Sequence, residues 1–368
     1  MDTLEARIAF SMLNGINLST GRELLRRLGS VEAVFAAGEE SMASAIGRRG
    51  GIASAAVRED AVRRAASEAA FVRSNHVRAL FFTDEDYPQR LLECDDAPAL
   101  VYALGDTPLN SMRTVAIVGT RHCTAYGQEF TRRLVAGLAE RYGHDIAIIS
   151  GLAYGVDVAA HRAALQAGLP TVGVMANPLN TVYPAEHRDV AVRMVREGGM
   201  LLSEYSTDRS VHRGFFLARN RIVAGLADAV VVVESDLRGG AMSTARMASA
   251  YGRELFAAPG RATDVYSRGC LDLIARNMAS VVRDADDIAE ALGWQPEESG
   301  SQKQLLLELT EVQQSVVEHL RRHPESTVND MCVALGMKYA SLSSLLFELE
   351  MADVLMTVPG GRYVVLDR

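Results

Sequence analysis

The sequence predicts an α/β protein built around a mostly parallel sheet, and three observations support that fold class. Between residues 77 and 258, short apolar runs alternate with helical stretches, which is the order of βαβ units. Several of the runs are rich in Val and Ile, as expected of strands buried on both faces of a parallel sheet. Glycine-containing turns follow several runs. Right-handed crossovers place such turns along one sheet edge, where ligands bind.

Residues 1–74 are rich in alanine and carry only helical signals. The stretch Leu13–Ile16 predicts a tight turn, and the helix that follows it stops at Gly29. This pattern fits a SAM-like or helix-hairpin-helix-like domain over residues 1–74, with a loop at 47–52. Contact with a DNA backbone and a purely structural packing role both remain open for this domain.

Residues 77–294 form the predicted sheet domain. The first of its helices is indicated by Phe130, Leu134 and Leu138, which share one helical face. Strands are expected at 79–82, 97–102, 114–118, 146–149, 171–175, 200–202, 229–233 and 254–258, and helices at 127–140, 156–167 and 241–251.

A polar linker is predicted at residues 295–304, followed by a winged-helix domain over 305–368. Apolar spacing there indicates three helices, and two short strands flank a Pro-Gly-Gly turn at 359–361. The third helix carries Lys338 but then mainly Ser, Leu and Glu. Packing or protein contact is therefore favoured over direct DNA reading for this helix.

Composition narrows the class of protein. Of 368 residues, 48% are hydrophobic and 23% charged, which is typical of a globular protein. No apolar run is long enough to span a bilayer and the first five residues lack signal-peptide features, so we expect a cytoplasmic protein without membrane contact. We expect no cofactor. The cysteines are far apart and lack metal-site spacing, so we also expect no metal and no disulfide; they are Cys94, Cys123, Cys270 and Cys332.

The net charge of −8 does not exclude nucleic acid, because binding depends on a local patch. Residues 209–221 contain five basic side chains and no acid. They are Arg209, His212, Arg213, Arg219 and Arg221. A solvated surface without a ligand is the alternative interpretation.

The stretch from Phe215 to Ala245 has the features of a phosphate site. A strand at 229–233 leads through Gly239-Gly240 into a helix, so free N–H groups lie at a helix start, where anions bind. The upstream Arg219-Asn220-Arg221 segment adds two cations and an amide. Phe215 or Phe216 is available as a platform for stacked bases, with core packing as the alternative.

Two further turns follow predicted strands. In Gly119-Thr120-Arg121, the glycine admits close backbone approach, and the arginine can grip two phosphate oxygens. The turn does not match GxGxxG, because Cys123 and Thr124 occupy later positions, and this disfavours NAD or FAD.

The second turn contains Gly151, Tyr154 and Gly155 and leads into a helix with Asp157 and His161. Their spacing of four residues fits an acid–base pair, but we favour a structural pair that orders the helix start. The sequence lacks GxSxG, HExxH and Walker A motifs, so we expect no enzyme activity. Glu204 is the best acidic candidate, although it can equally organise its loop.

Several of these segments occur in one order that resembles a known family. They are VAIVGTR at 115–121, SGLAYGVD at 150–157 with Ala160-His161, Ser203-Glu204, RNRIVAGL at 219–226, Gly239-Gly240-Ala241 with Thr244-Ala245, and Pro259-Gly260. Together they resemble the bacterial DNA-processing protein A family, also called Smf. The resemblance covers residues 77–292, and the flanking domains fit the family's three-part layout.

The resemblance implies a non-catalytic protein with an extended Rossmann-like sheet. Such a protein binds and protects single-stranded DNA in natural transformation, loads a RecA-type recombinase, and forms homodimers through the sheet domain. The implied DNA-binding residues are Gly119, Thr120, Arg121, Gly151, Tyr154, Gly155, Phe216, Arg219, Asn220, Arg221, Gly239, Gly240 and Thr244. We expect Ala at both Arg219 and Arg221 to weaken DNA binding while leaving the fold intact.

The sequence departs from the family pattern at two places. Leu217 occupies the position of a usual proline, and the turn at 175–180 contains Pro178, which has no N–H to offer a phosphate. A nucleotide phosphoribohydrolase on the same scaffold is the alternative function. That family carries PGGxGTxxE, whereas residues 237–245 lack the proline and the acid. A purely structural interaction module is the third possibility.

Overall fold

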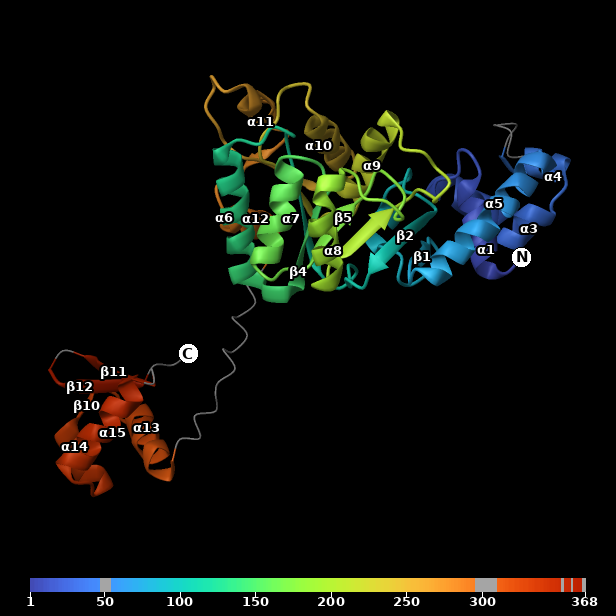
Figure 1. Cartoon of the computed structure of the whole chain (residues 1–368). Helices are drawn as coiled ribbons and strands as arrows, with labels where there is room; N and C mark the ends of the chain where they lie inside the picture. Colours follow the sequence, from blue (N-terminus) through green and yellow to red (C-terminus); the bar gives the residue numbers. More distant parts are fainter. Residues whose placement is uncertain (47–53, 295–309, 352–353, 359, 366–368) are drawn as a thin grey trace. The chain divides into compact units, whose positions relative to one another are not determined.

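The computed structural model describes residues 1–46, 54–294, 310–351, 354–358 and 360–365 (Figure 1). The described residues fall into two compact units, Met1–Glu297 and Glu298–Arg368. The predicted loop at 47–52 and linker at 295–304 lie outside the described residues, so the domain boundaries drawn through them stay predictions.

The described residues of the first unit form a nine-stranded sheet in the order β1-β2-β6-β5-β4-β3-β7-β8-β9. All pairs from β6 to β9 are parallel, whereas β2 is antiparallel to both β1 and β6. The predicted mostly parallel α/β fold is therefore confirmed. The strands are β1 (Arg78–Phe81), β2 (Leu100–Gly105), β3 (Arg113–Val118), β4 (Ile146–Ser150), β5 (Thr171–Val174), β6 (Met200–Ser203), β7 (Ala229–Val232), β8 (Glu254–Ala257) and β9 (Ser280–Val281).

The strand order reverses at β3. The chain proceeds from β3 to β4, β5 and β6 on one side, and then returns to place β7 on the other side of β3. In such sheets the loops at the carboxyl ends of the two central strands diverge and leave a crevice, where ligands bind. The predicted glycine turns follow β3, β4 and β7, and so they meet at this point.

The two faces of the sheet pack against different helices. Val115 and Ile117 of β3 face one hydrophobic cluster, and Ala116 and Val118 face the other, which is the alternation expected of a strand. The first face is covered by α6 (Ala125–Tyr142), α7 (Val156–Gln166), α8 (Arg188–Arg196) and α12 (Ala285–Ala291), and the second by α9 (Arg213–Gly225), α10 (Gly240–Ala250) and α11 (Arg268–Ala275). Figure 1 shows α6, α7 and α8 side by side on the first face.

The described part of residues 1–74 forms five helices, as the alanine-rich sequence predicts. Asn17 caps the second by accepting a hydrogen bond from the Thr20 amide, and Gly29 ends it with a φ of 94°. The five helices share one hydrophobic cluster with β1 and β2. In this cluster the ring centroids of Phe10 and Phe81 lie 5.8 Å apart. The helices are α1 (Thr3–Met12), α2 (Leu18–Leu28), α3 (Val31–Ala36), α4 (Glu39–Ile46) and α5 (Ala55–Ser74).

The second unit has the predicted winged-helix outline. Its described residues form three helices and a three-stranded antiparallel sheet in the order β10-β12-β11, in which β10 was not predicted. Predicted residues Pro359 and Leu366 lie outside the described range. The elements are α13 (Glu311–Arg322), β10 (Ser326–Thr327), α14 (Val328–Leu335), α15 (Tyr339–Met351), β11 (Leu355–Val358) and β12 (Arg362–Val365).

Among the described residues, no single helix is both long and apolar enough to cross a membrane. One sharply bent pair, Val328–Leu335 with Tyr339–Glu350, meets the length and composition requirements. Leu342, Leu346 and Leu349 of this pair are buried in the core of the second unit.

Candidate nucleic-acid interface

A groove of about 430 Å³ lies at the carboxyl edge of the sheet where the strand order reverses. The turns after β3, β4 and β7 line it together with α9 and the start of α10. The groove brings together ten of the predicted site residues. Their contacts with DNA stay predictions. The ten are Gly119, Thr120, Arg121, Gly151, Phe216, Arg219, Asn220, Gly239, Gly240 and Thr244.

The N-terminus of α10 opens into this groove. Gly239 precedes the helix, and a Cβ atom there would lie 2.3 Å from the Ser235 hydroxyl oxygen, so a larger residue would require the Ser235 side chain to move. Gly240 is exposed and faces open space. The first N–H groups of an α-helix lack intrahelical partners and carry the positive end of the helix dipole. This end of the groove is therefore suited to a phosphate.

Aromatic side chains form the opposite part of the groove. The Phe216 ring lies 5.4 Å from the Tyr183 ring, and the Arg121 guanidinium carbon lies 5.5 Å from the Phe216 centroid. A small adjoining cavity is lined by these three residues and by Tyr154, whose side chain is 41% exposed. A base can stack on such rings whatever its sequence.

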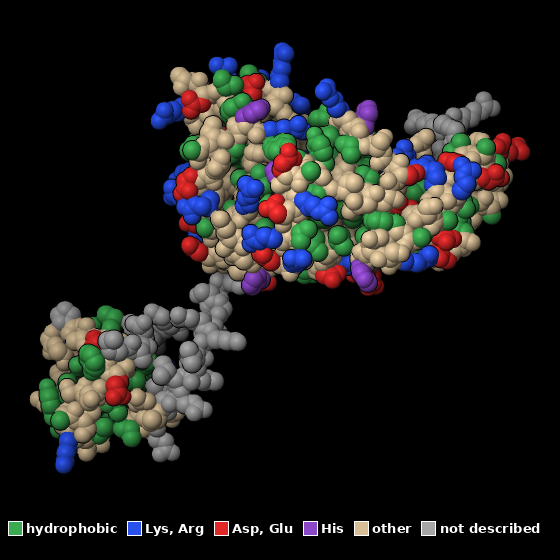
Figure 2. Space-filling view, in the orientation of Figure 1, with side chains coloured by type: hydrophobic (Ala, Val, Ile, Leu, Met, Phe, Trp, Pro, Cys, Tyr) green, Lys and Arg blue, Asp and Glu red, His purple; other side chains and the backbone are tan. Residues whose placement is uncertain are grey.

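Two exposed arginines line the groove, Arg121 and Arg238. Two more, Arg261 and Arg268, lie near Tyr266 in the sequence, and Tyr266 also lines the groove. These four arginines are exposed and form no ion pair with any residue that the structure describes. Figure 2 shows basic side chains projecting from this edge of the first unit, near α10 and α11. The local charge thus differs from the overall charge of −8.

Arg219 is a buried structural cation, which the sequence did not indicate. Its side chain donates hydrogen bonds to the carbonyl oxygens of Gly151, at 2.6 Å, and Val174, and the residue is 4% exposed. A Cβ atom at Gly151 would lie 2.5 Å from this guanidinium. Arg219 therefore ties α9 to the ends of β4 and β5, and we expect its removal to destabilise the fold.

Arg221 lies outside the groove. The segment that contains both arginines is helical, and positions two residues apart on a helix are separated by about 200° around its axis. Arg221 therefore points away from Arg219 and forms an ion pair with Glu204. The two arginines therefore do not point into one groove, and their predicted contacts with DNA stay predictions.

The remaining predicted residues occupy supporting positions. Tyr154 donates a hydrogen bond to Glu186 at 2.9 Å. Gly155 has a φ of 78°, and a Cβ atom there would meet the Thr120 carbonyl oxygen at 2.1 Å, so this glycine lets two turns touch. Thr244 lines the groove but is only 2% exposed.

The two departures from the family pattern have defined positions in the structure. Leu217 lies inside α9, lines the groove and is 55% exposed, so this position is helical and not part of a loop. In the turn at 175–180, Asn177 is buried and its side-chain amide donates to the carbonyl oxygens of Pro178 and Thr181. The turn is thus held by its own hydrogen bonds.

Asp157 and His161 do not form the predicted pair. The Asp157 carboxylate accepts a hydrogen bond from the Ala153 amide at 3.4 Å, whereas His161 Nδ1 lies 2.7 Å from the Thr171 hydroxyl. Burial raises the pKa of Asp157, against the opposing effect of the Arg219 charge. Burial, together with the charges of Arg219 and His187, lowers the pKa of His161 to about 3.

His161 should make the protein less stable in acid. Its pKa is lower in the folded chain than the ordinary value of 6.5, so the unfolded state binds its proton more readily. The resulting stability is complete above about pH 6.5 and falls toward pH 3 by up to about 1.4 kcal/mol per pH unit. Urea unfolding of the parent and of His161→Gln between pH 7 and pH 4 measures this contribution. Equal pH dependence in both proteins would exclude it.

Several groove residues were not predicted from the sequence. His122, Asp236, Arg238 and Tyr266 line the groove, and Tyr183 lines the adjoining cavity. Each lies only a few residues from a predicted turn, but the neighbouring sequence does not show whether its side chain faces the groove. Within the described ranges, no group of three or more His, Cys, Asp or Glu side chains could hold a metal ion.

The fold and groove define a Rossmann-like α/β protein whose ligand crevice lies at the reversal point of its sheet, joined to a winged-helix unit. Residues 78–293 match the model of the family described as DNA recombination-mediator protein A, and residues 300–361 match the DprA winged helix domain. The chain therefore belongs to the DNA recombination-mediator protein A family.

Curated relatives agree with this assignment. A protein of Mycobacterium tuberculosis named putative DNA processing protein DprA is 40% identical over 282 residues, which cover 75% of this chain and 71% of the relative. The DNA processing protein DprA of Streptococcus pneumoniae is 37% identical over 207 residues, covering 56% of this chain and 72% of the relative.

Two solved structures are similar to the chain. The structure of Streptococcus pneumoniae DprA has a TM-score of 0.65 and 29% identity, covering 79% of this chain and 98% of that one. A Helicobacter pylori structure has a TM-score of 0.52 and 33% identity, covering 59% and 95%. Its title concerns the single-stranded DNA binding mode of DNA processing protein A.

Proposed function

We propose that the chain binds single-stranded DNA in the groove and acts in the processing of DNA during natural transformation. The observation that carries the proposal is the arrangement of Phe216, Arg121 and the start of α10 along one groove. Aromatic rings hold bases of any sequence, and cations with helix N–H groups hold the backbone between them. Such a site accepts an unpaired strand, whose bases are free to stack.

The names of the relatives support the same role. The Helicobacter pylori protein is titled as a single-stranded DNA binder, and the curated relatives are named DNA processing proteins. Protection of the strand, loading of a RecA-type recombinase and a homodimer formed through the sheet domain complete the proposal. Family membership supports these three features.

The proposed role is non-catalytic and needs no cofactor. Asp157 lines the groove but is only 8% exposed, and Glu204 is paired with Arg221 outside it. Asp236 is the one other carboxylate among the described lining residues, and a single carboxylate does not form an acid–base pair. The alternative nucleotide phosphoribohydrolase would release a free base from nucleoside monophosphates. Chromatography of such a reaction mixture would detect that base, and its release would contradict the non-catalytic role.

Titration of fluorescent oligonucleotides tests the proposal. We expect tighter binding to a single strand than to a duplex of the same length. The logarithm of the binding constant should fall linearly with the logarithm of salt concentration, with a slope of about −0.7 for each phosphate contacted. Binding that is equal for both forms, or insensitive to salt between about 50 and 200 mM, would contradict the proposal.

A further inference from the structure

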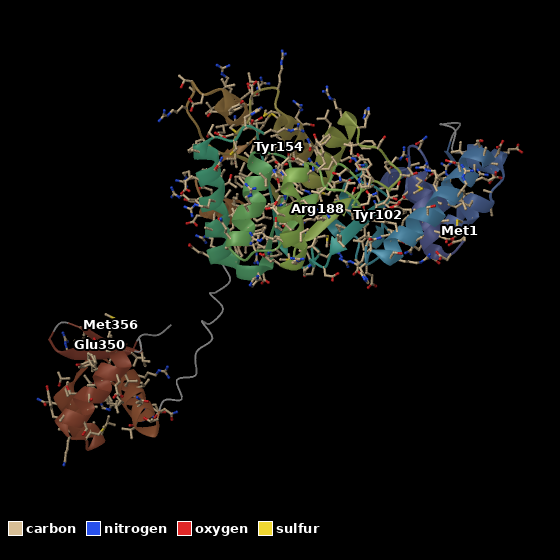
Figure 3. The ribbon with its side chains drawn as sticks, viewed as in Figure 1. Met1, Tyr102, Tyr154, Arg188, Glu350 and Met356 are labelled. Carbon is tan, nitrogen blue, oxygen red and sulfur yellow. The ribbon has the colours of Figure 1, made fainter. Side chains whose placement is uncertain are left out.

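The groove contains a second aromatic surface in addition to Phe216. The rings of His122 and Tyr266 are nearly parallel, with centroids 6.1 Å apart and an angle of 22° between them. Both residues line the groove; His122 is exposed and Tyr266 is half-buried. Neither side chain forms a hydrogen bond or an ion pair with a residue that the structure describes, so both rings can contact a ligand. Figure 3 labels Tyr154, which lines the adjoining cavity, at this edge of the first unit, where α7 begins.

The turn after β3 directs two successive side chains to the two aromatic surfaces. The Arg121 guanidinium carbon lies 5.5 Å from the Phe216 centroid, whereas the next residue, His122, packs against Tyr266. Phe216 belongs to α9, and Tyr266 precedes α11. Among the described residues no ring contact joins one surface to the other. The groove therefore carries two separate aromatic surfaces.

The start of α10 is linked to both surfaces. Asn220, one helical turn after Phe216, donates a hydrogen bond at 3.4 Å to a carbonyl oxygen of the Gly239-Gly240 segment. Ser235 packs against the same segment, and its backbone amide donates to the Tyr266 carbonyl oxygen at 2.6 Å. A phosphate bound at this helix start is therefore close to an aromatic surface from each direction.

The second surface is held in place by the segment that follows β7. The Glu234 carbonyl oxygen accepts a hydrogen bond from the Thr120 amide at 2.6 Å, and the Thr120 hydroxyl accepts one from the His122 amide at 3.1 Å. The next residue, Ser235, holds the Tyr266 backbone. Both ring-bearing residues are thus fixed through their backbones, which reduces the conformational entropy lost when a ligand binds.

Exposed arginines accompany the second surface. Arg238 lines the groove directly before Gly239, and Arg268 follows Tyr266 by two residues. Neither arginine forms an ion pair within the described part of the chain. Histidine and tyrosine rings stack on unpaired bases, and neighbouring cations meet the backbone phosphates. This combination fits a nucleotide of a strand better than an uncharged aromatic ligand, which would leave the cations without a partner.

We propose that His122 and Tyr266 form a second base-stacking site, so that one DNA strand places one base on Phe216 and another on this pair. A phosphate of the intervening backbone then lies at the start of α10. This inference rests on the proposed binding of single-stranded DNA and adds to it the positions of two bases. Since every base has a face that can stack, the second site should accept any sequence.

Three changes at His122 test the proposal in the full chain, by fluorescence anisotropy with one labelled oligo(dT). His122→Ala should weaken binding about five- to 150-fold, as the loss of one base stack does, and leave the dependence on salt unchanged. His122→Phe keeps a ring and should bind as the parent does. His122→Lys keeps a cation without a ring and should not restore the affinity of the parent. Because this side chain is exposed, none of the changes should alter the melting temperature.

His144→Ala is the matched control. His144 is also exposed, but it directly precedes β4, at the opposite edge of the sheet, and it lines neither the groove nor the adjoining cavity. Its loss should leave binding unchanged. At the partner ring, Tyr266→Leu should weaken binding as His122→Ala does, whereas Tyr266→Phe should not, because stacking requires the ring and not the hydroxyl.

The outcomes separate this inference from the function on which it rests. If Phe216→Ala weakens binding and His122→Ala does not, the second stacking site is wrong while the groove assignment stands. Full affinity in His122→Lys, or a salt slope smaller by about 0.7 in His122→Ala, would show a phosphate contact in place of a stack and would also overturn the inference. If the parent binds no single strand, the proposed function fails, and the second site fails with it.

Discussion

Replacing Arg219 with Ala should lower the free energy of unfolding by at least about 1–3 kcal/mol, the cost of leaving a buried carbonyl oxygen without its hydrogen-bond donor. The Asp157 carboxylate is buried close enough to Arg219 for each charge to affect the pKa of the other. The change also removes the donors to the Gly151 and Val174 carbonyls. Urea unfolding monitored by circular dichroism measures the difference.

Arg196→Ala is the matched control for this prediction. Arg196 is exposed at the end of α8, away from the groove, and forms no ion pair with a described residue. A surface change of this kind should alter stability by less than about 0.5 kcal/mol. If Arg219→Ala behaved like Arg196→Ala, the structural role of Arg219 would be wrong, and a free cation in the groove would be the better assignment.

Replacing Phe216 with Ala should weaken single-stranded DNA binding by about 1–3 kcal/mol, the usual value of one base–aromatic stack. This corresponds to a loss of about five- to 150-fold. Phe216 is only partly buried, so its ring is available to a ligand, and Arg121 lies over it. Fluorescence anisotropy with a labelled oligonucleotide measures the loss. Phe216→Tyr, which keeps the ring face, should bind as the parent does.

The strands could be predicted because each is a short, local apolar run. In the run 229–233, for example, every residue is apolar, and polar neighbours on both sides set its boundaries. β9 and β10 have two residues each, too few for a pattern, and were missed. The order of the strands was not predicted, because local apolar runs do not show which strands are neighbours in the sheet.

The direction of the site's side chains was harder to predict. Placing Gly119, Gly151 and Gly239 at one edge required only the rule that turns after parallel strands meet there. The positions of Arg219 and Arg221 depend on the helix that contains them, because neighbouring residues of a helix point in different directions. Ala218 and Ile222 are four residues apart, and so are Arg219 and Val223. This spacing places each pair on one side of a helix.

The most direct test of the groove as the binding site is a salt series with the parent and Phe216→Ala on one single-stranded oligonucleotide. Since Phe216 contacts no phosphate in this account, its loss should lower affinity by a similar factor at every salt concentration and leave the slope unchanged. Affinity equal to that of the parent across the whole series would contradict the assignment of DNA to this groove.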